Sequence, residues 1–265
     1  MDPLVTITFS GQTSLITGAS SGLGLEFART LAARGSNLVL VARREAVLDQ
    51  EAEALRAAHG VTVTTIAADL ARRAAATELH AELSTRGLTI QTLINNAGFG
   101  TYCPFINEDP ARIAAEIQLN VGTLVALTHA LLPELTSAGR GALVNVASTA
   151  AFQPVPTMAV YSATKAFVLN FTEAIAHEVR DTGLRVLALC PGATRTEFFD
   201  VVGTEQAAVG GFQTSQQVIT TAMRALDRKR TPAYIVSGAA NKASTLAVSA
   251  LPRSLAVAAA SRAVG

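Results

Sequence analysis

The chain has 265 residues, of which 49% are hydrophobic and only 15% are charged, and its formal net charge is +1. This composition provides ample material for a hydrophobic core and excludes an intrinsically disordered polymer. The basic side chains cluster only at residues 228–230, which is too little for nucleic-acid binding, because that function depends on many phosphate contacts.

Short apolar runs alternate along the chain with longer segments of helical period. Runs that are apolar at almost every residue are typical of strands covered on both faces, and they predict strands at 13–17, 37–42, 61–67, 90–95, 141–147 and 185–190. Helical character lies between them, at 23–34, 45–58, 71–86, 109–137 and 158–181. Such alternation predicts parallel strands joined by right-handed crossovers, that is, a doubly wound α/β sheet in a single domain.

The rhythm lapses after residue 191, where glycine, phenylalanine and polar residues mix without a period. We expect a substrate flap at about 193–214, then a helix at 215–227 and a last strand at 233–236. The final segment, about 241–264, is apolar but interrupted by Pro252 and Arg253, and its longest uncharged run is too short for a membrane span. We interpret it as a packing or oligomer helix, with weak membrane association as the alternative.

The N-terminus lacks a basic start followed by an apolar core, so no secretory signal is expected. The two cysteines, Cys103 and Cys190, have no CxxC spacing and are interpreted as small apolar fillers in a reducing compartment, which favours a cytoplasmic location. The four histidines are scattered through helical stretches, and a metal site is not expected.

The segment TGASSGLG, residues 17–24, joins the first predicted strand to the first predicted helix. Glycines let the backbone turn sharply and let a pyrophosphate approach it, while the helix start directs free N–H groups at the anion. A bare turn is the alternative, but the place between strand and helix favours a dinucleotide loop. The residues expected to bind a cofactor here are Gly18, Ser20, Ser21, Gly22, Leu23 and Gly24.

Two arginines, Arg43 and Arg44, stand at the end of the second predicted strand. Enzymes that bind NAD often place a carboxylate there to accept from the ribose 2′-hydroxyl, whereas a guanidinium suits a 2′-phosphate. A solvated charge at a helix start is the alternative. The arginines therefore predict NADP(H) as the cofactor in preference to NAD(H).

The segment YSATK, residues 161–165, places a tyrosine four positions ahead of a lysine. It follows NNAG at 95–98, Asn120 and Ser148, and it precedes the dipeptide PG at 191–192. In this order and spacing, over roughly residues 11–237, the chain resembles the short-chain dehydrogenases/reductases. The resemblance implies a single Rossmann-type domain and reversible hydride transfer between nicotinamide and a carbonyl or alcohol.

The resemblance also implies cofactor contacts beyond the glycine loop. Asp69 matches the acid that contacts adenine, with Leu70 beside the ring. The remaining positions implied near the ribose, the cofactor and its carboxamide are Asn95, Ala97, Gly98, Pro191, Gly192, Thr194 and Thr196.

For catalysis, the resemblance implies that Tyr161 is the general acid–base and that Ser148 holds the carbonyl oxygen. Lys165 shares a helix face with Tyr161 and would lower the pKa of the phenol, besides gripping the nicotinamide ribose. Asn120 would keep a water in the proton path to the lysine. Taken singly, each residue also has a structural interpretation: Ser148 as a strand-end cap, Asn120 as a partner of helix backbone, and Lys165 as a solvated surface charge.

Aromatic side chains and small loops suggest a mostly apolar substrate pocket. Its expected walls are residues 98–102 and 151–156 together with Phe198, Phe199 and Phe212 of the flap. Three functions remain open: an NADP-dependent carbonyl reductase or alcohol dehydrogenase acting on a small molecule, a reductase of carrier-bound 3-oxoacyl groups, and a non-catalytic dinucleotide sensor. By family analogy, a homodimer or homotetramer is expected.

Overall fold

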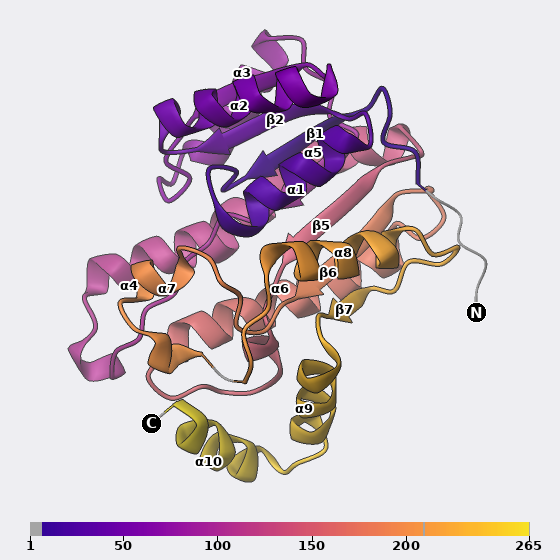
Figure 1. Cartoon of the computed structure of the whole chain (residues 1–265). Coiled ribbons are helices and arrows are strands. Elements are labelled where there is room, and N and C mark those ends of the chain that lie inside the picture. The colour runs from indigo at the N-terminus through magenta and orange to yellow at the C-terminus, as the bar shows by residue number, and fades with distance from the viewer. Residues whose placement is uncertain (1–6, 209, 265) are drawn as a thin grey trace.

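The computed structural model describes residues 7–208 and 210–264. Residues 1–6 and 265 of the expected domain, and residue 209 of the expected flap, lie outside the described residues. The described chain forms a seven-stranded, all-parallel sheet in the order β3-β2-β1-β4-β5-β6-β7 (Figure 1). Its strands are β1 (Thr13–Thr17), β2 (Asn37–Ala42), β3 (Val63–Ala67), β4 (Thr92–Asn95), β5 (Ala142–Val146), β6 (Arg185–Cys190) and β7 (Tyr234–Val236). The predicted doubly wound α/β fold is confirmed.

Helices cover both faces of the sheet. One layer contains α1 (Gly22–Ala33), α2 (Glu45–His59) and α8 (Ser215–Leu226), and Figure 1 shows α1 and α8 lying side by side. The other layer contains α3 (Ala75–Thr85), α5 (Leu124–Ser137) and α6 (Ala159–Glu178).

Alternation of side chains along each strand separates two hydrophobic cores. Ile16 and Leu40 belong to the core under α1 and α8, whereas their neighbours Leu15 and Val39 belong to the core under α3 and α5. All four side chains are fully buried. A strand buried on both faces needs an apolar residue at nearly every position, which explains the continuous apolar runs in the sequence.

The strand order reverses beside β1, whose neighbours are β2 on one side and β4 on the other. In open parallel sheets, ligands bind at the carboxyl ends of the strands where the order reverses. The loops that follow β1 and β4 begin at Gly18 and Asn96 and therefore face each other across this point.

The long helix predicted at 109–137 begins as α4 (Pro110–Ile117) and continues through a π-helical turn, η2 (Gln118–Thr123), into α5. Asp109 caps its start by accepting a hydrogen bond from the backbone N–H of Ala111 at 2.9 Å. By length and composition alone, the helix Pro110–Ser137 passes as a candidate membrane span. Core helices pass the same test, and here Leu127 and Leu131 pack in the core beneath the sheet.

Several boundaries differ from the prediction. The helix expected at 71–86 begins only at Ala75, because Asp69 forms a turn in which its side chain accepts from the N–H of Ala71. The flap is not wholly irregular and contains α7 (Phe198–Val202) and a 3₁₀ turn, η4 (Glu205–Ala207). The apolar C-terminal segment forms two helices, α9 (Ala239–Ser249) and α10 (Arg253–Val264), because Pro252 interrupts the backbone hydrogen bonding between them.

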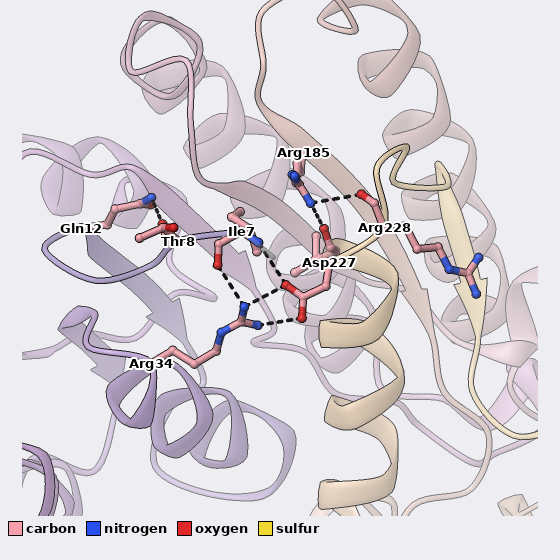
Figure 2. A network of polar contacts seen from close by, with 8 residues as sticks. Ile7, Thr8, Gln12, Arg34, Arg185, Asp227 and Arg228 are labelled. Atoms are coloured by element: carbon pink, nitrogen blue, oxygen red, sulfur yellow. Dashed lines mark hydrogen bonds and ion pairs between the residues drawn. The ribbon is translucent and has the colours of Figure 1, made fainter. Parts of the chain in front are cut away.

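At the amino ends of the strands, an ion-pair network joins α1 to α8 (Figure 2). Arg34 contacts Asp227 through two nitrogen–oxygen pairs of 2.8 and 3.2 Å. Arg34 also donates to the carbonyl of Ile7 at 2.9 Å, and the N–H of Ile7 donates to Asp227 at 3.2 Å. Arg185, at the start of β6, donates to the carbonyls of Leu226 and Arg228. The network therefore stabilises the amino-terminal side of the sheet, opposite the carboxyl ends where ligands bind.

Candidate active site

A large cleft opens at the carboxyl ends of the strands, with a volume of about 770 Å³. Its walls come from the loop after β1, the ends of β2, β3, β4 and β5, the start of α6, the flap and α9. The predicted residues that line it are Gly18, Ser20, Ser21, Gly22, Leu23, Arg43, Arg44, Asp69, Leu70, Ala97, Gly98, Ser148, Tyr161, Lys165, Pro191, Gly192, Thr194 and Thr196.

The glycine loop leaves no room for side chains where it turns into α1. Gly18 and Gly22 have φ values of +66° and +54°, a backbone conformation that other residues rarely adopt. A Cβ atom on Gly24 would lie 2.2 Å from the carbonyl oxygen of Gly18. Gly24 does not line the cleft, so its role is the close packing of helix against loop.

The same loop presents an anion-binding helix start. Ser21 precedes α1 in extended conformation, and its side chain caps none of the first backbone N–H groups. Uncapped N–H groups and the positive end of the helix dipole suit a phosphate. The loop therefore fits a dinucleotide pyrophosphate, and Ser20, Ser21 and Gly22 of the cleft wall would hold it.

The side chain of Asn95, a position expected near the cofactor ribose, does not face the cleft. Asn95 points into the core, where it donates to Thr128 Oγ1 at 3.0 Å and to Asn145 Oδ1 at 2.9 Å. Its neighbour Asn96 lines the cleft instead and donates to the carbonyl of Thr17 at 2.9 Å. The segment NNAG drew attention to both asparagines, but only strand alternation distinguishes the one that faces the core.

Arg44 lies at the cleft wall and is already engaged. It forms an ion pair with Glu197 of the flap at 2.8 Å and donates to Ser20 Oγ at 3.1 Å. The hydrogen bond from Arg44 holds the pKa of the Glu197 carboxyl below its usual range. Arg43 is exposed beside it. Glu197 was not foreseen, since nothing in the sequence signals that the flap reaches the end of β2.

Ser148, Tyr161 and Lys165 meet at the inner end of the cleft. Ser148 follows β5 and accepts a hydrogen bond from the N–H of Ala150 at 3.1 Å, and it also hydrogen-bonds the Tyr161 hydroxyl. Lys165 is 6% exposed and donates to the carbonyl of Val146 at 2.8 Å. Its Nζ lies 5.7 Å from the centroid of the Tyr161 ring. The structural interpretation of Lys165 as a surface charge is therefore wrong.

Burial dominates the acidities of this group. Loss of solvent raises the pKa of Tyr161 to about 12, although the hydrogen bond with Ser148 acts in the opposite direction. Burial also lowers the pKa of Lys165 to about 8. The expectation that the lysine would lower the tyrosine pKa is thus not met by the protein's own groups, because the desolvation of the phenol outweighs the effect of its neighbours.

Asn120 lies in the π-helical turn, is 1% exposed and does not line the cleft. Its Oδ1 accepts from the N–H of Phe99 at 3.1 Å, while its Nδ2 donates to the carbonyl of Phe99 at 2.8 Å and to Thr164 Oγ1 at 3.1 Å. Asn120 therefore braces the loop after β4 against α6. The π-helical turn, a feature frequent at functional sites, directs it there.

Part of the cleft wall is aromatic. Phe99, Phe152, Phe198 and Phe199 line it, and Phe198 lies 5.4 Å from the Tyr161 ring. Phe212 does not line the cleft but packs edge-on against Phe199 at 5.2 Å.

Two further groups of wall residues were missed by sequence reasoning. Arg112 of α4 reaches the cleft wall and donates to the carbonyl of Val201 in the flap at 3.0 Å. The helix α9 adds Asn241, Ser244 and Val248. The sequence showed α9 only as part of an apolar segment, with no sign of where it packs.

Comparison with known proteins identifies similar chains. Residues 12–207 match the family described as short chain dehydrogenase. Sulfoacetaldehyde reductase 2 of Chromohalobacter salexigens is 40% identical over 197 residues, which cover 73% of this chain and 77% of that protein. The ketoacyl reductase HetN of a Nostoc species is 32% identical over 229 residues, covering 86% and 79%. A solved short-chain dehydrogenase from Sphingobium yanoikuyae, in complex with NADPH, is 35% identical with a TM-score of 0.79, covering 89% of this chain and 92% of that one.

Proposed function

The chain belongs to the short-chain dehydrogenase/reductase family of oxidoreductases, and on that premise we propose that it is an NADP(H)-dependent enzyme acting on a small, mostly apolar carbonyl or alcohol. The observation that carries this proposal is the meeting of Ser148, Tyr161 and Lys165 at the inner end of one cleft whose outer walls are aromatic.

Tyr161 and Ser148 each have a chemical role in the proposed reaction. When bound, the nicotinamide dinucleotide supplies or accepts the hydride. In reduction, Tyr161 holds a proton on its hydroxyl oxygen and donates it to the carbonyl oxygen of the substrate. Ser148 donates a hydrogen bond to the same oxygen and stabilises its growing negative charge. A tyrosine pKa of about 12 keeps the phenol protonated at neutral pH, as an acid requires.

The preference for NADP(H) rests on the end of β2. Arg43 and Arg44 stand where a carboxylate would favour NAD, and Ser20 adds a hydroxyl group beside them. A guanidinium binds phosphate through parallel hydrogen bonds that a ribose hydroxyl cannot match. The Sphingobium yanoikuyae relative, solved with NADPH, is consistent with this preference.

The small apolar substrate is inferred from the walls of the cleft. Phe99, Phe152 and Phe198 favour an aromatic or lipid-like ketone, because they offer apolar surface without hydrogen-bonding groups. Reduction of a 3-oxoacyl group is the second candidate, favoured by the similarity to the ketoacyl reductase HetN. A carrier-bound substrate would also need cationic groups at the cleft mouth, whereas Arg195, which lies over the ring of Phe212 at 5.0 Å, does not line the cleft.

We also expect the chain to assemble as a homodimer or homotetramer through its long helices. Ile117 and Phe167, on the outer faces of the helix 110–137 and of α6, are 46% and 43% exposed. Weak membrane association is the competing use of apolar surface, since Leu246 of α9 and Leu255 of α10 are 60% and 55% exposed. Light scattering of the purified chain, with and without lipid vesicles, distinguishes the two.

A panel of carbonyl compounds tests the proposal. Oxidation of NADPH is followed in the presence of aliphatic, aromatic, steroid-like and 3-oxoacyl compounds, with NADH in parallel. We expect turnover of apolar ketones with NADPH. Turnover restricted to 3-oxoacyl thioesters would favour the second candidate. A blank panel with retained NADPH binding would favour a dinucleotide sensor.

A further inference from the structure

A buried carboxyl group lies on α4, which packs against the helix α6 that carries Tyr161 and Lys165, and it does not line the cleft. Glu116 lies in the last turn of α4, four residues before Asn120, and is 0% exposed. Its Oε2 accepts a hydrogen bond from Thr101 Oγ1 at 2.9 Å. Its Oε1 is buried and has no hydrogen-bond partner among the described residues. A carboxyl group is rarely buried in this way, because its ionised form loses the hydration of water.

The carboxyl group ends a hydrogen-bond chain that starts in the flap. Arg112 donates from Nη2 to the carbonyl of Val201 at 3.0 Å, and from Nε to Thr101 Oγ1 at 3.0 Å. Thr101 then donates to Glu116. Arg112 also lies over the ring of Phe99, at 5.2 Å from its centroid. The side chains of α4 thus connect the helix α7 of the flap to the buried carboxyl group.

The charged groups that act on Glu116 come from three elements. They are Glu108 in the segment before α4, Arg112 on α4 itself, and Lys165 on α6. Burial has the largest effect and raises the pKa of Glu116 to about 7, while Arg112 and Lys165 act in the opposite direction. In return, the carboxylate raises the pKa of Lys165 and that of Tyr161.

We propose that Glu116 is a positioning residue of the active site, whose charge favours the ammonium form of Lys165 and the phenol form of Tyr161. Its hydrogen bond to Thr101 also anchors Arg112, and with it the flap. This inference rests on the proposed function, since it assigns a group that, in addition to burial, acts on the charge states of the catalytic pair. A merely structural carboxyl group would leave those charge states unchanged.

The variant Glu116→Gln tests the proposal, because it removes the charge and keeps the shape and a hydrogen-bond acceptor for Thr101. With the carboxylate gone, both Lys165 and Tyr161 lose their protons more easily. The measurement is the pH profile of kcat/KM of the holoenzyme in both reaction directions. We expect the fall at alkaline pH in reduction, and the rise with pH in oxidation, to move to lower pH by about half a unit or more. Glu178→Gln, an exposed change of equal charge at the end of α6, leaves both limbs in place.

A second readout needs neither substrate nor cofactor. The ultraviolet absorbance of phenolate is titrated in the wild type and in Glu116→Gln, each against the same chain carrying Tyr161→Phe, and the difference reports Tyr161 alone. We expect the Tyr161 titration to move to lower pH in Glu116→Gln. An unchanged titration overturns the inference, even if carbonyl turnover confirms the proposed function. A chain that turns over no carbonyl while its titration moves removes the proposed function only.

Two further variants keep the test decisive if Glu116→Gln folds poorly. Glu116→Asp keeps the negative charge, and we expect it to restore both pH limbs toward the wild type. Thr101→Val keeps the carboxyl group but removes the hydrogen bond that stabilises its charge, so we expect a smaller shift in the same direction as Glu116→Gln. Wild-type limbs in Thr101→Val and displaced limbs in Glu116→Asp would together contradict the proposal.

Discussion

Arg44 and Glu197 form a two-pronged ion pair, with nitrogen–oxygen distances of 2.8 and 3.1 Å, that joins the end of β2 to the flap. The Glu197 carboxylate thus binds the Arg44 guanidinium, which is the group that we assign to a cofactor 2′-phosphate. Phosphate and carboxylate therefore compete for one fork of hydrogen-bond donors.

The competition predicts opposite effects of the two partners on NADPH affinity. Arg44→Ala should weaken NADPH about tenfold or more and leave NADH nearly unchanged, because a charge-assisted bidentate contact is lost. Glu197→Gln should tighten NADPH a few-fold, since the competing charge is gone. Fluorescence titration of both cofactors measures this, with Glu45→Gln, an exposed neighbouring carboxylate, as the control. Equal losses of NADPH and NADH affinity in Arg44→Ala would remove the 2′-phosphate assignment.

Tyr161→Phe separates chemistry from binding. The phenol is the only proton donor that we assign, so we expect turnover to fall by at least about a hundredfold while NADPH still binds. Tyr234→Phe, the same change at a partly exposed tyrosine on β7, serves as the control and should retain full activity. Activity retained in Tyr161→Phe would exclude the phenol from the mechanism.

Glu116 predicts a pH dependence of stability with a definite sign. Its pKa rises from 4.5 to about 7 on folding, so between these values the native state binds more protons than the unfolded state. The corresponding stabilisation, up to about 3 kcal/mol, is complete below pH 4.5 and is lost as the pH rises through 7.

Chemical unfolding at several pH values between these limits measures this effect. Since the chain has no tryptophan, circular dichroism is the suitable probe. The unfolding free energy of Glu116→Gln, relative to the wild type, should rise as the pH increases through this window. Parallel curves for the two proteins would show that Glu116 does not titrate on folding.

The Arg34–Asp227 network at the amino ends of the strands predicts a loss of stability without a loss of catalytic activity. The side chains of Arg34 and Asp227 are each only about one-fifth exposed. Asp227→Asn removes their ion pair and should lower the free energy of unfolding by about 2 kcal/mol. Asp181→Asn, where the carboxylate side chain is 86% exposed, should cost almost nothing. Urea midpoints measure both, and kcat of Asp227→Asn below its unfolding transition should match the wild type.

The sheet and the dinucleotide loop were predictable because their determinants are local. Continuous apolar runs required buried strands, and the positive φ values of Gly18 and Gly22 required residues without a Cβ atom. The meeting of Ser148 with Tyr161 followed from the resemblance to a known family, since the two come from different elements.

The remainder of the site depends on contacts between distant segments. Glu197 meets Arg44 across 153 positions of the chain, and Arg112 reaches the carbonyl of Val201 across 89. The acidity of Tyr161 follows from how deeply the phenol is covered, which a helical spacing of four residues does not reveal. The side chain of Asn95 faces the core because the pleat of β4, and not the motif, decides which way it turns.

Because α9 lines the cleft, substrate recognition and catalysis depend on different parts of the chain. The proton donor and its neighbours stand after β5 and on α6, whereas Asn241, Ser244 and Val248 are contributed by the last tenth or so of the chain. Exchange of this C-terminal appendage between related enzymes would therefore alter which molecules are admitted while the hydride chemistry stays intact.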